Sequence, residues 1–153
     1  PTIHINDRVM VNKLSTRFGP PERFDVVVFT DPSAPEREES FLQAVRRSVL
    51  EAVGVSVREE DLIKRVIGLP GDTLTIDDDR VHINGVPIDE PYLPEGIHMA
   101  DFGPVTLADD EIFMMGDNRE FSMDSRAFGP IPLDHVIGEA VLIIWPPGRV
   151  GGL

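Results

Sequence analysis

One lysine lies inside an otherwise apolar segment, residues 62–69, whose sequence is LIKRVIGL. In a strand, successive side chains point to opposite faces, so Lys64 and Arg65 would face opposite sides of a sheet. If Lys64 faces inward, burial disfavours the ammonium form and lowers its pKa. A neutral lysine amine can act as a general base. On spacing alone, however, a solvated charge at a sheet edge is the more common arrangement.

A second segment, residues 116–126, is dense in small polar residues and follows a predicted strand; its sequence is GDNREFSMDSR. Asp124 and Arg126 are spaced to form an ion pair that would hold the loop rigid. Asp117 is placed to accept hydrogen bonds from backbone amides and so fix the turn. Such a loop can present a hydroxyl beside a base on a neighbouring strand. A structural turn with a surface salt bridge explains the same residues without chemistry.

The sequence lacks the motifs of several other hydrolytic mechanisms. It contains no Gly-x-Ser-x-Gly elbow, no His-Glu-x-x-His and no phosphate-binding loop. The four histidines are scattered and there is no cysteine, so neither a metal nor another cofactor is expected. No serine has an obvious histidine partner. A serine–lysine mechanism needs only one hydroxyl and one buried amine, and it fits these residues better.

Composition limits the remaining classes of function. With 153 residues, 41% of them hydrophobic, the chain can form one domain with its own core. Its net charge of −13 argues against nucleic acid as a partner and against general attraction to anionic lipid. No apolar run approaches the roughly 18 residues that span a bilayer. The chain starts abruptly in strand-like sequence, which we interpret as a fragment of a longer protein.

The elements that would position these segments are mostly short strands. Strands are predicted by the runs at residues 23–29, 62–69, 73–76, 80–83, 86–88, 111–117 and 135–145. Residues 3–14 also look extended, Asn84-Gly85 predicts a hairpin turn, and Gly138 predicts a bulge. We predict an ordered loop over residues 89–104. Many short strands with frequent turns indicate a mainly β, barrel-like domain of antiparallel hairpins covering residues 1–153.

One helix is expected, near residues 35–54. Pro35 suits its first turn, acidic residues follow, and apolar residues then recur at helical spacing until Gly54. The helix lies within a predicted insertion, residues 33–60, to which the sequence assigns no chemistry.

Four segments together resemble the motifs of the bacterial type I signal peptidases, a family of serine–lysine endopeptidases, and they occur in that family's order. They are PTIHINDRVMVNK (1–13), RFDVVVF (23–29), KRVIGLPGD (64–72) and MGDNREFSMDSRAFG (115–129). The last matches the family pattern Gly-Asp-Asn-Arg-x-x-Ser-x-Asp-Ser-Arg at every defining position. Phe24 departs from the family pattern, which has glycine there.

The resemblance implies a role for each matching residue. Lys64 matches the general base, and Ser122 matches the hydroxyl that hydrogen-bonds and orients it. Supporting roles fall on Gly116, Asp117, Asn118, Arg119, Asp124, Ser125 and Arg126. The nucleophilic serine of the family would stand three residues before Pro1, with the membrane anchor further upstream. The chain without that serine is expected to be inactive.

The implied reaction is the cleavage of signal peptides from exported preproteins after small residues at the −3 and −1 positions. Shallow apolar pockets would explain this preference, because larger side chains would clash. Ile3, Ile5, Val66 and Ile67 are the candidate residues that line them. The resemblance places the enzyme in the bacterial cell membrane, with its catalytic domain on the extracytoplasmic face.

Two other interpretations stay open. A self-cleaving repressor would share a serine–lysine dyad and a related β fold, although the 116–126 motif argues against it. A catalytically dead β domain that binds peptides is the non-enzymatic alternative. The residue at the upstream serine position would separate it from an active peptidase.

Overall fold

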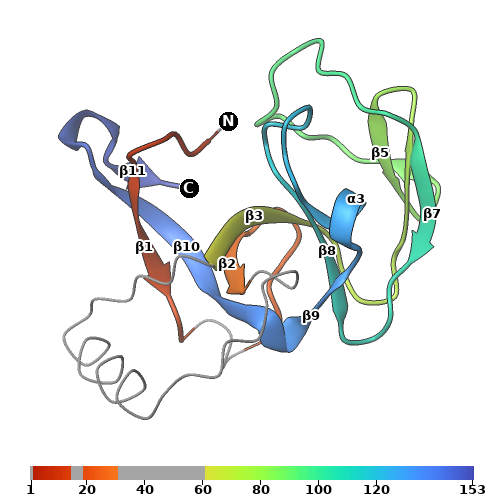
Figure 1. Ribbon diagram of the computed structural model, residues 1–153, viewed down its shortest axis with the longest axis horizontal. Coiled ribbons are helices and arrows are strands. Elements are labelled where there is room, and N and C mark those ends of the chain that lie inside the picture. Colours follow the sequence, from red (N-terminus) through yellow and green to blue (C-terminus); the bar gives the residue numbers. More distant parts are fainter. Residues whose placement is uncertain (1, 15–18, 31–60) are drawn as a thin grey trace.

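The computed structural model describes residues 2–14, 19–30 and 61–153. Within these residues the chain consists mainly of antiparallel strands arranged in two sheets (Figure 1). The predicted mainly β class is therefore confirmed. The helix expected near residues 35–54, and the insertion that contains it, lie outside the described residues.

The larger sheet has seven strands and carries both segments in which chemistry was expected. Its order is β1-β10-β2-β3-β8-β9, and β11 pairs with β10. The strands are β1 (Arg8–Asn12), β2 (Val26–Thr30), β3 (Asp61–Gly68), β8 (Glu111–Met115), β9 (Ile131–Pro132), β10 (Val136–Trp145) and β11 (Gly151–Gly152). The register between β10 and β2 shifts between Val136 and Gly138, which agrees with the predicted bulge at Gly138.

The smaller sheet has four strands in the order β6-β5-β4-β7. They are β4 (Thr73–Asp77), β5 (Arg80–Ile83), β6 (Val86–Pro87) and β7 (Phe102–Thr106). Asn84 and Gly85 form the β5–β6 turn with φ of 53° and 80°, as the hairpin prediction requires. The loop prediction for residues 89–104 is wrong at its end, because β7 begins at Phe102. β7 is an edge strand, and an edge strand tolerates Pro104.

Two hydrophobic cores share β3 and β8. Along these strands alternate side chains enter alternate cores, since neighbouring residues of a strand face opposite ways. One core, next to the smaller sheet, contains Ile67, Leu74, Ile76, Val81, Ile83, Met99, Leu107, Phe113 and Met115. The other contains Val27, Phe29, Val66, Ile112, Met114, Ile131 and Val136. Lys64 has the parity of Val66, whereas Arg65 has that of Ile67, so the two cations leave β3 on opposite faces as predicted.

Three short helical segments punctuate the second half of the chain. They are the α-helical turn α3 (Ser125–Phe128) and the 3-10 turns η1 (Leu133–His135) and η2 (Pro147–Arg149). The side chain of Asp124 caps α3 by accepting a hydrogen bond from the backbone N–H of Arg126. Because α3 follows directly on the polar segment, this cap anchors the end of the 116–126 loop.

Candidate active site

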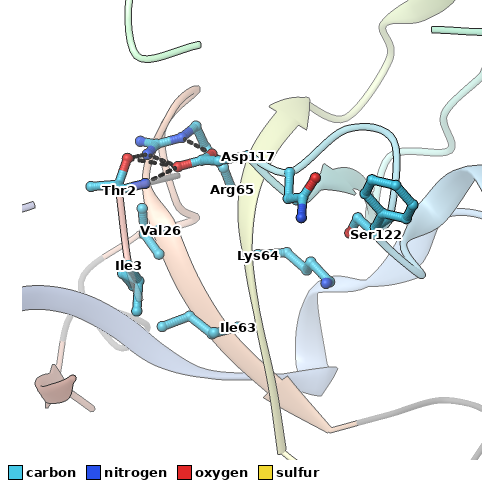
Figure 2. A pocket seen from close by; sticks show the side chains of 11 residues that line it. Thr2, Ile3, Val26, Ile63, Lys64, Arg65, Asp117 and Ser122 are labelled. Carbon is cyan, nitrogen blue, oxygen red and sulfur yellow. Dashed lines mark hydrogen bonds and ion pairs between the residues drawn. The ribbon is translucent and has the colours of Figure 1, made fainter. Parts of the chain in front are cut away.

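A cavity of about 210 Å³ lies where the start of the chain, β2, β3 and the loop after β8 meet (Figure 2). Its lining residues are Thr2, Ile3, Val26, Ile63, Lys64, Arg65, Gly116, Asp117, Asn118, Phe121 and Ser122. Segments distant in the sequence therefore converge on one site, and it includes both Lys64 and Ser122.

Lys64 projects from β3 towards the loop that carries Ser122 (Figure 2). Burial lowers the pKa of its amine, because the ammonium form loses hydration. The carboxylates of Asp124 and Asp117 act in the opposite direction, while the guanidinium of Arg126 lowers the pKa further. The outcome is an amine with a pKa below its ordinary value, which is the property that a general base needs near neutral pH.

Ser122 and Lys64 both approach Gly116. A Cβ on Gly116 would lie 2.7 Å from the Cβ of Ser122 and 3.5 Å from the Nζ of Lys64. The absence of a side chain at this position therefore leaves room for both groups. The Oγ of Ser122 is buried and has no hydrogen-bond partner of acceptable geometry among the described residues. A buried hydroxyl of this kind, next to a buried amine, is available for the chemistry of the pocket.

Asp124 and Arg126 hold the loop from within. Both carboxylate oxygens of Asp124 accept hydrogen bonds from Arg126, at 2.9 and 2.8 Å, and the second also accepts one from the backbone N–H of Gly116. Burial alone would raise the pKa of Asp124, but these bonds outweigh it and hold the pKa below its usual range. The Oγ of Ser125 accepts a hydrogen bond from the N–H of Met114 in the core. Through the bond to Gly116, the Asp124–Arg126 pair joins the loop to the end of β8.

Arg65, Asp117 and Thr2 form a second cluster at the other side of the cavity (Figure 2). Arg65 donates two hydrogen bonds of 2.9 Å to the carboxylate of Asp117 and one of 2.8 Å to the hydroxyl of Thr2. Thr2 donates its own hydroxyl and backbone N–H to Asp117. Burial opposes ionisation of Asp117, yet the bonds from Arg65 and Thr2 keep its pKa low. This cluster fixes the start of the described chain beside the pocket.

The structure brings only part of the expected pocket wall to the cavity. Of the expected wall residues, Ile3 lines the cavity; Asn118, expected only to support the loop, lines it as well. Val66 and Ile67 are fully buried, one in each core, because strand alternation turns both side chains into packed interior. Ile5 is 94% exposed in the turn before β1. These three residues lie away from the pocket, and Val26, Ile63 and Phe121 provide apolar lining instead.

Several residues that matter to the site were not singled out in the sequence. From the sequence, Arg65 is only the neighbour of Lys64, and Thr2 is only part of the segment that resembles the family. Glu90 and Tyr92 contact the buried arginines of the site from the loop after β6. Their sole signal in the sequence was an aromatic and an acidic residue in a segment without periodicity, which predicts no partner.

Phe24 occupies a backbone position that explains why the family pattern has glycine there. Its φ is 78°, in the left-handed region that non-glycine residues rarely adopt. The ring compensates by packing edge-on against Tyr92, with 5.8 Å between centroids. The carbonyl oxygen of Phe24 accepts a hydrogen bond from Arg65, so this departure from the pattern leaves the backbone contact with the cluster in place.

The described residues offer neither a cluster of metal-ligating side chains nor a membrane-spanning helix. No group of three or more potential metal-ligating side chains occurs among them. Nor do they include a helix of sufficient length and apolarity to cross a bilayer.

A lysine with a lowered pKa beside a buried hydroxyl, on a β scaffold, is the arrangement that a serine–lysine hydrolase would need. A family model described as "Signal peptidase, peptidase S26" matches residues 1–145. The chain therefore belongs to the signal peptidase family, peptidase S26.

The relatives agree with this assignment. A signal peptidase I of Mycobacterium tuberculosis is 40% identical over 185 aligned residues, which include 99% of this chain and 63% of the relative. A signal peptidase I of Leptolyngbya laminosa is 37% identical over 153 residues, covering 100% of this chain and 67% of the relative. The chain thus spans about two thirds of the length of these relatives.

A solved structure shows the same fold. The crystal structure of a signal peptidase I from Enterococcus faecalis matches with a TM-score of 0.57 and 28% sequence identity. The match covers 79% of this chain and 97% of that one.

Proposed function

We propose that the protein to which this chain belongs is a serine endopeptidase that removes signal peptides from exported preproteins, with Lys64 as the general base. The observation that carries the proposal is the burial of the Lys64 amine next to Ser122, in a pocket that also contains the start of the chain. Family membership indicates the class of reaction, peptide-bond hydrolysis, and the pocket around Lys64 is where we expect it to occur.

In the proposed reaction, a serine upstream of Pro1 is the nucleophile. Its oxygen attacks the scissile carbonyl carbon while its proton passes to the Nζ of Lys64. The protonated amine then gives this proton to the leaving amine, the C–N bond breaks, and an acyl-enzyme ester remains. Lys64 next accepts a proton from water, whose oxygen attacks the ester. The C–O bond breaks and the proton returns to the serine.

Three features support this reaction and its preference for small side chains. Ser122 has a buried hydroxyl close to Lys64 and Asp124, where it is suited to orienting the amine. Thr2 is held at the pocket by Arg65 and Asp117, so residues just before it would start next to the site. The cavity is small and has apolar walls at Ile3, Val26 and Ile63, which suits the small side chains expected at −1 and −3.

Membrane association is part of the same proposal. Exposed apolar side chains occur along β1, at the end of β10 and in the turns beside them, namely Ile5, Met10, Leu14, Ile144, Trp145 and Val150. β1 and β10 are paired, with Arg8 opposite Trp145. These exposed apolar side chains support the proposal that the enzyme works at a membrane, and family membership suggests its extracytoplasmic side.

The experiment compares two lysine substitutions in the chain extended upstream with its native residues. The chain contains only two lysines, Lys13 and Lys64. We expect Lys64→Met to lower kcat for a preprotein substrate by about 10³-fold, the scale of a lost general base. Lys13→Met, which changes an exposed residue outside the pocket, should leave kcat unchanged.

The same variants provide a check on folding. Folding lowers the pKa of Lys64 from its ordinary value of 10.5, so the protonated side chain opposes folding at pH values below the folded pKa. That penalty disappears as the pH rises towards 10.5. Lys64→Met should therefore be at least as stable as the parent at pH 7, by thermal unfolding, with a smaller difference at high pH. Full cleavage by a folded Lys64→Met protein would refute the proposed base.

A further inference from the structure

The loop between β6 and β7, residues 88–101, crosses from the smaller sheet to the candidate active site. Its two ends are fixed to the β4–β5 hairpin: Ile88 N–H donates to the carbonyl of Val81, and Met99 N–H donates to the carboxylate of Asp79 at 2.7 Å. Between these ends, Glu90 contacts the buried Arg119 of the 116–126 loop, and Tyr92 contacts the buried Arg65 of β3. We call residues 88–101 the strap.

Glu90 holds Arg119. The guanidinium of Arg119 is completely buried and donates to both carboxylate oxygens of Glu90, one of them at 3.0 Å. Its Nε donates at 3.1 Å to the carbonyl of Gly116, the residue between Ser122 and Lys64. Burial alone would lower the pKa of Arg119, but Glu90 raises it above its usual value. A buried bidentate pair of this kind fixes both position and orientation.

Tyr92 holds Arg65. The ring of Tyr92 lies 4.0 Å below the guanidinium carbon of Arg65, a cation–π contact. The same guanidinium donates hydrogen bonds to Asp117 and Thr2, which both line the pocket. The Tyr92 hydroxyl donates to Glu90, which ties the two contacts together. Burial raises the pKa of Tyr92, and the hydrogen bond to Glu90 raises it further. The hydroxyl therefore stays protonated and remains a donor.

We propose that Glu90 and Tyr92 are positioning residues for the cleavage reaction: they set the 116–126 loop through Arg119 and the start of the chain through Arg65. Neither residue lines the cavity, so each acts through an arginine. This inference rests on the proposed function, because it assumes that the start of the chain leads to the nucleophile. The smaller sheet then contributes to the reaction by anchoring the strap.

Glu90 and Tyr92 contact different arginines, so substitutions of the two residues should have different effects on the cleavage reaction. Arg65 reaches Thr2 and therefore the upstream segment, whereas Arg119 reaches Gly116 and therefore the space between Ser122 and Lys64. Tyr92 should affect how well the nucleophile is placed far more than it changes the pKa of the amine. Arg65 is not among the charges that shift the Lys64 pKa, and its partner Asp117 has the smallest effect of those that do. Misplacement of a reacting group lowers kcat more than it changes substrate binding.

The test measures kcat and KM separately in the upstream-extended protein. We expect Tyr92→Leu, which removes the ring below Arg65, to lower kcat about tenfold with KM nearly unchanged. Tyr92→Phe keeps the ring and should restore most of kcat. The acid limb of the pH profile of kcat should stay in place in both variants. Glu95→Gln, an exposed change in the same strap, is the control and should match the parent.

Amide hydrogen exchange supplies a readout that does not depend on activity. In Tyr92→Leu, exchange should accelerate at residues 2–7, which Arg65 helps to hold, and should stay unchanged in β8. A structural role alone would leave kcat per folded molecule unchanged, and exchange would then rise evenly with the loss of stability.

The outcomes separate the two proposals. Normal kcat and normal exchange at residues 2–7 in a folded Tyr92→Leu protein would overturn the inference, while cleavage by the parent would still support the proposed function. An inactive parent would refute the proposed function, and the exchange result would then decide whether Tyr92 holds the start of the chain.

Discussion

At the scale of single residues, the charges around Lys64 oppose one another. Loss of hydration lowers the pKa of the amine, two aspartates raise it, and Arg126 lowers it again. Arg126 also neutralises Asp124, whose carboxylate would otherwise favour the ammonium form more strongly. The Asp124–Arg126 pair therefore stiffens the loop and also limits the effect of a buried carboxylate on a neighbouring base.

Replacing Arg126 should make this balance measurable. In Arg126→Gln the cation that lowers the pKa of Lys64 is lost, and Asp124 is left unpaired, so both effects raise that pKa. Because the neutral amine is the active form, the acid limb of the kcat/KM profile should move to higher pH. The rate at pH 7 falls, and part of the loss is recovered at alkaline pH. The pH dependence of preprotein cleavage is the measurement.

Arg80→Gln is the matched control, since Arg80 is an exposed arginine on β5 outside the pocket. Its profile should coincide with that of the parent. An acid limb that stays in place in Arg126→Gln, or moves to lower pH, would contradict the electrostatic role of Arg126.

At the scale of elements, the site depends on a close approach between the end of β8 and the loop that follows it. Gly116 lies at this approach, and the side chains of Ser122 and Lys64 both come close to it. The loop returns to the same place through the hydrogen bond from Gly116 N–H to Asp124. A residue without a side chain is needed because the loop folds back onto its own first residue.

Gly116→Ala should therefore damage the site out of proportion to its size. The new Cβ would stand 2.7 Å from the Cβ of Ser122, so the loop must shift. A displacement of about 1 Å in a reacting group costs on the order of 10²-fold in rate, and overpacking costs about 1–3 kcal/mol of stability. Cleavage kinetics and thermal unfolding measure the two effects.

Gly148→Ala provides the comparison, because a Cβ on Gly148 would meet no atom within 4 Å. We expect it to retain both activity and stability. Equal behaviour of the two alanine variants would show that the space at Gly116 has no functional importance.

Elements were easier to predict from the sequence than contacts between them. Most strands were found because alternation and β-branched runs are local signals. Lys64 and the 116–126 loop stand out in the sequence because their residue types are unusual for their positions, and both contribute residues to the cavity. Val66 and Ile67 were expected to line the pocket but lie in the two cores, because strand alternation tells which side chains share a face and not which face is open. Glu90 and Tyr92 gave no signal because their partners, Arg119 and Arg65, are distant in the sequence.

At the scale of the whole molecule, a large negative net charge is combined with exposed apolar side chains. The net charge is −13, yet the turns and strands around β1 and the end of β10 expose six large apolar side chains. Trp145 is the only tryptophan and lies among them, half exposed. This arrangement favours contact with a neutral lipid surface over an anionic one, because the negative charge opposes approach to anionic headgroups.

Trp145 fluorescence should report that contact directly. We expect its emission to shift to the blue when phosphatidylcholine vesicles are added, and to shift less with vesicles rich in anionic lipid. The double variant Ile144→Ser, Val150→Ser should weaken the response. Val86→Ser changes an exposed apolar residue of the smaller sheet and should leave it unaltered. An emission spectrum indifferent to every vesicle would exclude this surface as a membrane contact.

The sharing of β3 and β8 by the two cores has a consequence for how the protein loses its structure. Loss of either core would expose buried side chains of the same two strands, β3 and β8. The molecule should consequently melt in a single cooperative step, with no stable half-folded species. β3, which carries Lys64, should therefore stay folded as long as either core stays folded. A peptidase built this way would switch from fully competent to fully unfolded, and would not pass through a partly folded form that exposes its buried ion pairs.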